Sequence, residues 1–129
     1  MLAVDTNIVV RYLMNDNTEQ AARAKRFMDS NAVLLTATVV LETEWVLRSM
    51  YRLPAQSASA ATRQFIGLPA VTLQEPAEVA QALDWFEQGM DFADALHLAT
   101  AHDCTGLLTF DRDFIKSAAR IGAGNVAEP

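Results

Sequence analysis

Apolar and polar positions follow two different periods along the chain, and the change of period predicts the elements. Short apolar runs that suit strands lie at 2–4, 32–36, 70–73 and 107–110. Between them, apolar residues recur every three or four positions, which is typical of helices that bury one face. The helices expected from this spacing cover 7–14, 18–29, 39–52, 56–66, 76–88, 91–103 and 113–120.

Residues that favour helix ends mark several boundaries. Thr18 and Thr38 are expected to be N-caps, because a hydroxyl oxygen accepts hydrogen bonds from the free N–H groups of a first turn. Pro54 should stop the helix before it, since proline cannot continue the hydrogen-bond ladder. Gly89 should close another helix as a C-cap. The last segment, 122–129, is expected to be a weakly structured tail or an edge strand.

The alternation of short apolar strands with helices predicts the fold class. It indicates an α/β protein with a short, mostly parallel sheet that is flanked by helices on both faces. The 129 residues suffice for one domain, so we expect a single domain over 1–129. No apolar run is long enough for a transmembrane helix and no secretory signal is visible. We therefore expect a soluble, cytoplasmic protein.

The charge balance argues against one class of function, tight and non-specific nucleic-acid binding. Asp and Glu number 16 and Lys and Arg 10, which gives a formal net charge of −6. Because tight, non-specific nucleic-acid binding normally needs a basic protein, this class is disfavoured. An enzyme with its carboxylates in one cleft stays possible, since bound cations would reverse the local field. The single cysteine, Cys104, forms no intrachain disulfide and is expected to be a small core residue.

Four acidic residues fall at one edge of the predicted sheet. Asp5 and Asp111 follow strands, whereas Glu42 and Asp94 lie in the first turns of helices. Strand ends and the following helix starts share the edge at which open α/β sheets bind ligands. Carboxylates gathered there repel one another unless a cation compensates them, and Mg²⁺ takes oxygen ligands. The pattern predicts a cation site suited to phosphoryl chemistry.

Other kinds of site find little support. His97 and His102 lack a third partner for zinc, and His97 is expected to be a packed or capping residue. Glycine-rich phosphate loops are absent, so no nucleotide cofactor is expected. A phosphatase of the haloacid-dehalogenase kind would need an aspartate where the chain has Asn7.

Four segments of the chain resemble the PIN-domain family, and within it the VapC toxins of bacterial toxin–antitoxin pairs. They are VDTNIVVRYL at 4–13, VVLETEWVLR at 39–48, DFADALHLATA at 91–101 and LLTFDRDF at 107–114. They occur in the family's order and span nearly the whole chain. The resemblance implies a PIN-like three-layer fold and an endoribonuclease that depends on Mg²⁺ or Mn²⁺.

The resemblance also implies roles for individual acids. The family's four catalytic acids fall on Asp5, Glu42, Asp94 and Asp111. Asp5, Asp94 and Asp111 would hold one or two metal ions. Glu42 would orient the attacking water or accept its proton.

Further residues would support this site. Thr6 and Thr109 match small polar positions, and their hydroxyls would hydrogen-bond a carboxylate or a water. Asp91 matches an acid that many members carry, but not all. Arg11 and Arg112 follow Asp5 and Asp111 closely and are the preferred candidates for phosphate contacts. Other candidates at the rim are Arg48, Arg52, Arg63 and Lys116.

Two positions leave alternatives open. Glu44 stands where the family usually has an apolar residue, so it is either an exposed charge or a competitor of Glu42. Asp113 could replace Asp111 in the site. We favour Asp111, because Asp113 is better placed to cap the last helix.

The resemblance implies partners as well. These are an RNA substrate, a second copy in a homodimer, and a small antitoxin that blocks the site. DNA contact is expected only through the antitoxin. Apolar residues that could exceed the needs of a small core would serve such partners, although we expect most of them to be buried; they are Trp45, Met50, Tyr51 and several leucines. The alternative function is a catalytically silent PIN-like module that binds a protein partner; loss of one acid would favour it, but all four are present.

Overall fold

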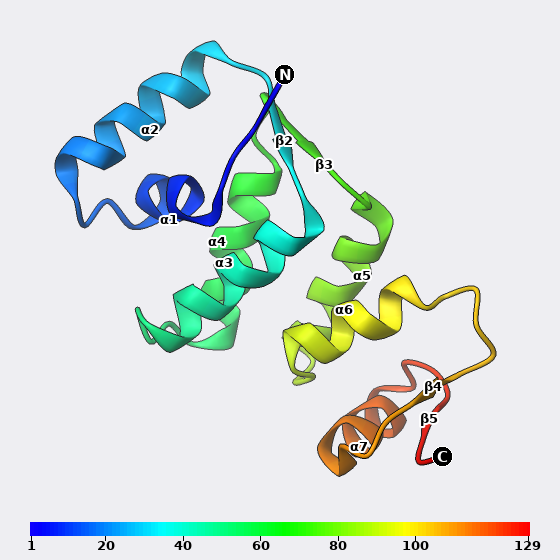
Figure 1. Ribbon diagram of the computed structural model, residues 1–129. Helices are drawn as coiled ribbons and strands as arrows, with labels where there is room; N and C mark the ends of the chain where they lie inside the picture. Colours follow the sequence, from blue (N-terminus) through cyan, green and yellow to red (C-terminus); the bar gives the residue numbers. More distant parts are fainter. The chain divides into compact units, whose positions relative to one another are not determined.

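The computed structural model describes residues 1–129 and divides into two compact units. The N-terminal unit is Met1–Glu75 and the C-terminal unit is Pro76–Pro129. Figure 1 follows the chain from the blue N-terminus to the red C-terminus. Each unit is described by itself.

The N-terminal unit combines a parallel sheet with four helices. Its elements are β1 (Leu2–Ala3), α1 (Thr6–Met14), α2 (Thr18–Ser30), β2 (Val33–Leu35), α3 (Ala37–Ser49), α4 (Ala55–Ile66) and β3 (Val71–Leu73). The strands pair in the order β1-β2-β3 and all run parallel. Figure 1 shows β2 and β3 side by side. Val33 in the central strand pairs with Leu2 on one side and Val71 on the other.

Apolar helix faces fill the core of the N-terminal unit. Val9 from α1, Leu47 from α3 and Phe65 from α4 are almost completely buried. The rings of Tyr12 and Phe65 meet edge to face with centroids 5.4 Å apart, a favoured aromatic geometry. Helix α2 packs on α1. Apolar residues therefore recur every three or four positions for the expected reason, the burial of one helix face.

The C-terminal unit is built on three helices and a second, smaller sheet. Its elements are α5 (Pro76–Glu87), α6 (Phe92–Thr100), β4 (Leu107–Leu108), α7 (Arg112–Ile121) and β5 (Val126–Ala127). Strands β4 and β5 run parallel. Helices α5 and α6 pack on each other, with the rings of Phe86 and Phe92 5.6 Å apart. Gly89 joins them at φ 107°, a conformation that other residues rarely adopt.

The α/β class with short parallel strands is confirmed. The difference from the expectation is that the strands divide between two sheets, one in each unit. The single domain over 1–129 stays a prediction. No helix combines the length and the hydropathy that a membrane crossing requires.

Two helix starts differ from the sequence prediction. Asn17, and not Thr18, caps α2, and its side chain accepts from the N–H of Gln20 at 3.1 Å. Thr36, and not Thr38, caps α3. A cap residue needs an extended backbone, which Asn17 and Thr36 have, whereas Thr18 and Thr38 already belong to the helices.

Helix α3 also ends earlier than predicted, at Ser49 instead of position 52. Two large apolar residues of the kind expected to be buried, Trp45 and Met50, are exposed. The exposed fractions are 56% for Trp45 and 70% for Met50. An apolar residue on a helix is buried only where a neighbouring element covers it, and periodicity does not show which side is covered.

Candidate active site

Asp5 and Glu42 lie together in the N-terminal unit. Asp5 follows β1 and caps α1, where its Oδ1 accepts from the N–H of Thr6 at 2.7 Å. Glu42 is exposed on the second turn of α3. Both residues line one pocket of about 560 Å³. The structure therefore brings two of the four predicted acids to a common cavity.

A polar network fixes Arg11 at the wall of this pocket. Arg11 Nη1 donates to Asp16 and to the Tyr51 hydroxyl, both at 3.1 Å, and its Nε donates to Gln20 at 2.7 Å. The Tyr51 hydroxyl donates to Asp16 at 2.6 Å. This hydrogen bond lowers the pKa of Asp16, and the charge of Arg11 lowers it further. The same hydrogen bond raises the pKa of Tyr51, against a smaller opposite effect of Arg11.

Asp16 and Tyr51 were not predicted as residues of this pocket. The sequence gives no sign that they meet, because Tyr51 lies 35 positions away from Asp16 along the chain. No spacing rule links two residues at that separation. The contact of Arg11 with a substrate phosphate stays a prediction.

The threonine next to Asp5 has no hydrogen-bond partner within the protein for its side chain. The Thr6 hydroxyl is buried and has no hydrogen-bond partner, as is also true of Thr43. The hydroxyl therefore has no carboxylate partner, and its predicted hydrogen bond to a metal-bound water stays a prediction.

Asp91 and Asp94 lie at the start of α6 in the C-terminal unit. Asp91 caps the helix, and its Oδ2 accepts from the N–H of Asp94 at 3.2 Å. Asp94 follows in the first turn and is half-buried. Asp91 thus has a local structural role, the capping of the turn that carries Asp94.

Asp111 lies between β4 and α7, and it caps α7. Its Oδ1 accepts from the N–H groups of Asp113 at 3.0 Å and Phe114 at 3.2 Å. Thr109 Oγ1 accepts from the N–H of Asp111 at 3.0 Å and so holds the turn. The sequence argument had assigned the cap to Asp113, and this was wrong, because Asp113 is already in the first helical turn.

Two neighbouring acids, Asp91 and Asp111, act electrostatically on Asp94. Burial, together with the negative charges of Asp91 and Asp111, raises the pKa of Asp94 to about 6, against an opposite effect of His97. Asp91, Asp94 and Asp111 are called the acidic cluster below. The cluster holds negative charge that a bound cation would offset.

The donor chemistry of the predicted site fits a hard divalent cation. Its candidates are carboxylates, the ligands that Mg²⁺ and Mn²⁺ prefer. No group of three or more His, Cys, Asp or Glu is arranged to hold a metal ion. Asp94 and Asp111 are the residues of the acidic cluster that would hold a cation, with Asp5 as the predicted third ligand. The four-acid site as a whole stays a prediction.

Glu44 and two arginines have roles that the sequence did not indicate. Glu44 is 1% exposed and forms an ion pair with Arg48 one turn along α3. The exposed-charge alternative for Glu44 is therefore wrong, and Arg48 holds a buried carboxylate. Arg112 is exposed, and its Nε lies 3.6 Å from a carboxylate oxygen of Glu128.

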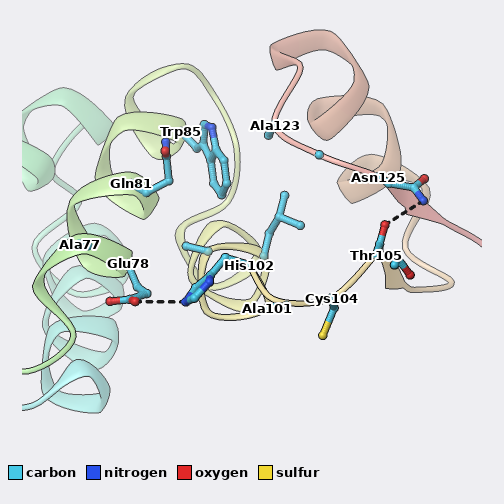
Figure 2. Close-up of a pocket in the computed structure, with 14 residues that line it drawn as sticks. Ala77, Glu78, Gln81, Trp85, Ala101, His102, Cys104, Thr105, Ala123 and Asn125 are labelled. Carbon is cyan, nitrogen blue, oxygen red and sulfur yellow. Dashed lines mark hydrogen bonds and ion pairs between the residues drawn. The ribbon is translucent and has the colours of Figure 1, made fainter.

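A separate pocket of about 480 Å³ lies in the C-terminal unit. Figure 2 shows the ion pair between Glu78 and His102, 3.3 Å apart, on one of its walls. Cys104 is exposed on the rim of this pocket. The prediction that it is a core residue is therefore wrong; α6 ends at Thr100, before Cys104. None of the acidic cluster lines this pocket, so we do not assign it to the active site.

The comparison with protein families covers nearly the whole chain. The family model described as the PIN domain matches residues 2–120. A comparison with curated proteins found no match. The matched range includes the segments of Asp5, Glu42, Asp94 and Asp111. The chain belongs to the PIN-domain family, whose members are generally metal-dependent nucleases.

Proposed function

We propose that the chain is an endoribonuclease that hydrolyses RNA phosphodiester bonds and depends on Mg²⁺ or Mn²⁺. Its catalytic acids in this proposal are Asp5, Glu42, Asp94 and Asp111. Membership of the PIN-domain family supports a nuclease. The observation that carries the proposal is the acidic cluster, in which burial and neighbouring charge raise the pKa of Asp94 to about 6. Perturbed carboxylates of this kind concentrate at functional sites.

Each residue has a role in the proposed chemistry. Asp94 and Asp111, with Asp5, would hold the cation. A bound divalent cation supplies an acidified water and neutralises charge on the leaving oxygen. Glu42, exposed in its pocket, would accept the proton of the attacking water. Thr109 holds the backbone of the turn that presents Asp111.

The test is RNA cleavage by the purified protein. Wild type is incubated with a structured RNA mixture in Mg²⁺ and in EDTA, next to Asp94→Asn in Mg²⁺. Asp103→Asn is the matched control, because the Asp103 side chain is 94% exposed and pairs only with His102. We expect cleavage that needs the metal and Asp94 but not Asp103. Undiminished cleavage by Asp94→Asn would contradict the assigned role.

Within this function, we propose that the chain is the toxin of a VapBC-type pair and forms a homodimer. The support is the resemblance of its four motifs, together with the exposed apolar residues Trp45 and Met50. A small antitoxin that inserts an arginine among the carboxylates would replace the cation's charge. Expression of the chain alone should arrest growth, and co-expression of the product of a neighbouring small gene should relieve the arrest. Unaffected growth would contradict the toxin role.

One observation favours a second candidate, a PIN-like module that binds a protein and does not cut RNA. No group of three or more potential ligands is arranged around a metal position. The cleavage test separates the two candidates. Wild type that is folded, free of any inhibitor and inactive on RNA in both Mg²⁺ and Mn²⁺ would favour the module.

A further inference from the structure

A groove of about 680 Å³ runs between α1 and α2 in the N-terminal unit. Its walls carry three arginines, Arg11, Arg23 and Arg26, and no Asp or Glu. The chain as a whole has a formal net charge of −6. The groove therefore carries local positive charge in an acidic protein, which would attract an anion.

The arginines of this groove have hydrogen-bond donors that no protein group accepts from. Arg23 and Arg26 are exposed and form no ion pair, even with Glu19 or Asp29 on the same helix. Arg11 donates through Nε and Nη1 to Gln20, Asp16 and Tyr51. Its Nη2 group has no protein partner. The network thus orients a guanidinium and leaves one edge free, which suits phosphate recognition.

The groove is continuous with the pocket of two predicted catalytic acids. Asn7 and Arg11 line both the groove and the pocket that contains Asp5 and Glu42. A strand with a phosphodiester at that pocket would extend directly into the groove. Phe27, half-buried on the groove wall, offers a ring on which a base can stack.

We propose that the groove between α1 and α2 binds the phosphate backbone of single-stranded RNA through Arg11, Arg23 and Arg26. The proposal rests on the proposed function, because it places the substrate's flanking nucleotides next to the predicted catalytic acids. An acidic peptide would also be attracted to the arginines. RNA is favoured because the aromatic wall suits a base, and because the groove opens into the pocket of Asp5 and Glu42, where the proposed function places a phosphodiester.

The test measures binding without cleavage. Anisotropy of a labelled, mixed-sequence single-stranded RNA is recorded in EDTA for wild type and for the double variant Arg23→Gln/Arg26→Gln. Lys25→Gln is the matched control, since Lys25 is exposed on the same helix but does not line the groove. Thermal unfolding followed by circular dichroism verifies that all three proteins are folded.

Loss of two phosphate contacts should weaken binding at low salt by about tenfold or more and reduce the salt slope by about 1.4. Lys25→Gln should change affinity by less than about twofold. No RNA binding by wild type, or equal binding by the double variant and the control, would overturn the proposal. Polyglutamate is the second probe, and a loss confined to polyglutamate would overturn it in favour of an acidic partner.

The outcome is separable from that of the cleavage test. If no condition supports cleavage but the double variant loses RNA binding, the groove is an RNA site and the nuclease proposal fails. If wild type cleaves RNA and the double variant binds normally, only the groove proposal fails.

Discussion

Asp16 in the N-terminal unit and Asp94 in the C-terminal unit have pKa values that move in opposite directions. Asp16 is exposed and accepts hydrogen bonds from Tyr51 and Arg11, which lower its pKa. Asp94 is half-buried, and burial with the charges of Asp91 and Asp111 raises its pKa to about 6. The protein stabilises the charge of Asp16 with its own hydrogen-bond donors, whereas it places negative charges next to Asp94.

This difference predicts where an external cation would bind. The charge of Asp16 is balanced by Arg11 and Tyr51, in the network that holds Arg11 in place. The charge of Asp94 is opposed by two other carboxylates and helped only by His97. Because like charges in a half-buried position repel, a divalent cation gains most by binding to the acidic cluster.

The largest expected effect comes from breaking the acidic cluster at Asp111. Asp111→Asn keeps an oxygen that caps α7 but removes the charge that acts on Asp94. Mutation of a residue that only orients a metal ligand commonly lowers activity by about 10–100-fold. Loss of a ligand itself should therefore lower the rate of RNA cleavage by more than about a hundredfold. The rate of RNA cleavage measures this effect. Asp113→Asn is the control, and a loss as large in the control would exclude Asp111 as the specific residue.

A smaller effect is expected on stability when Asp94 loses its charge. The native pKa of Asp94, about 6, exceeds the ordinary value of 3.8, so the folded state binds more protons between these values. The stabilising contribution is fully present below about 3.8 and is lost as the pH rises through about 6. In EDTA, stability should therefore fall over this window in wild type, and Asp94→Asn should remove this component of the fall.

At pH above this window, Asp94→Asn should be more stable than wild type in EDTA. We expect a gain of at most about 1 kcal/mol, because solvent screens a side chain that is only half-buried. This corresponds to roughly 3–5 °C in the melting temperature. Thermal unfolding at several pH values measures it. A lower melting temperature for the variant would show that the Asp94 charge is already compensated within the protein.

The smallest effect concerns the aspartate that the protein neutralises itself. Asp16→Asn should lower the pKa of Tyr51 toward its ordinary value of 10.0. The reason is that the Tyr51 hydroxyl then no longer donates to a negatively charged carboxylate. Ultraviolet absorbance of the phenolate follows the titration, with Tyr51→Phe identifying the contribution of Tyr12. An unchanged Tyr51 titration would mean that the two side chains are not bonded in solution.

Much of the fold could be predicted because helices and short strands carry distinct apolar periods. Helix ends were harder, since Asn17 and Thr18 are neighbours with similar capping chemistry and only the backbone conformation decides between them. The same limit applies to Asp111 and Asp113. Boundaries are set by local dihedral angles that the side-chain pattern does not reveal.

Burial and long-range contacts were the other limit. Glu44 is buried against Arg48 and Cys104 is exposed, opposite to what their residue types suggest. The acidic residues themselves could be found from their positions after strands and at helix starts. Their electrostatic coupling and the network of Asp16 with Tyr51 depend on which segments fold against each other, and no local spacing shows this.

The most direct measurement is a titration of the protein with Mn²⁺, followed by electron paramagnetic resonance of the free ion. Wild type should bind Mn²⁺, and Asp94→Asn should bind it at least about tenfold more weakly. Asp103→Asn, which changes an exposed acid of the same unit, should bind as wild type does. Equal Mn²⁺ affinity for wild type and Asp94→Asn, or no binding by wild type, would contradict a cation site at the acidic cluster.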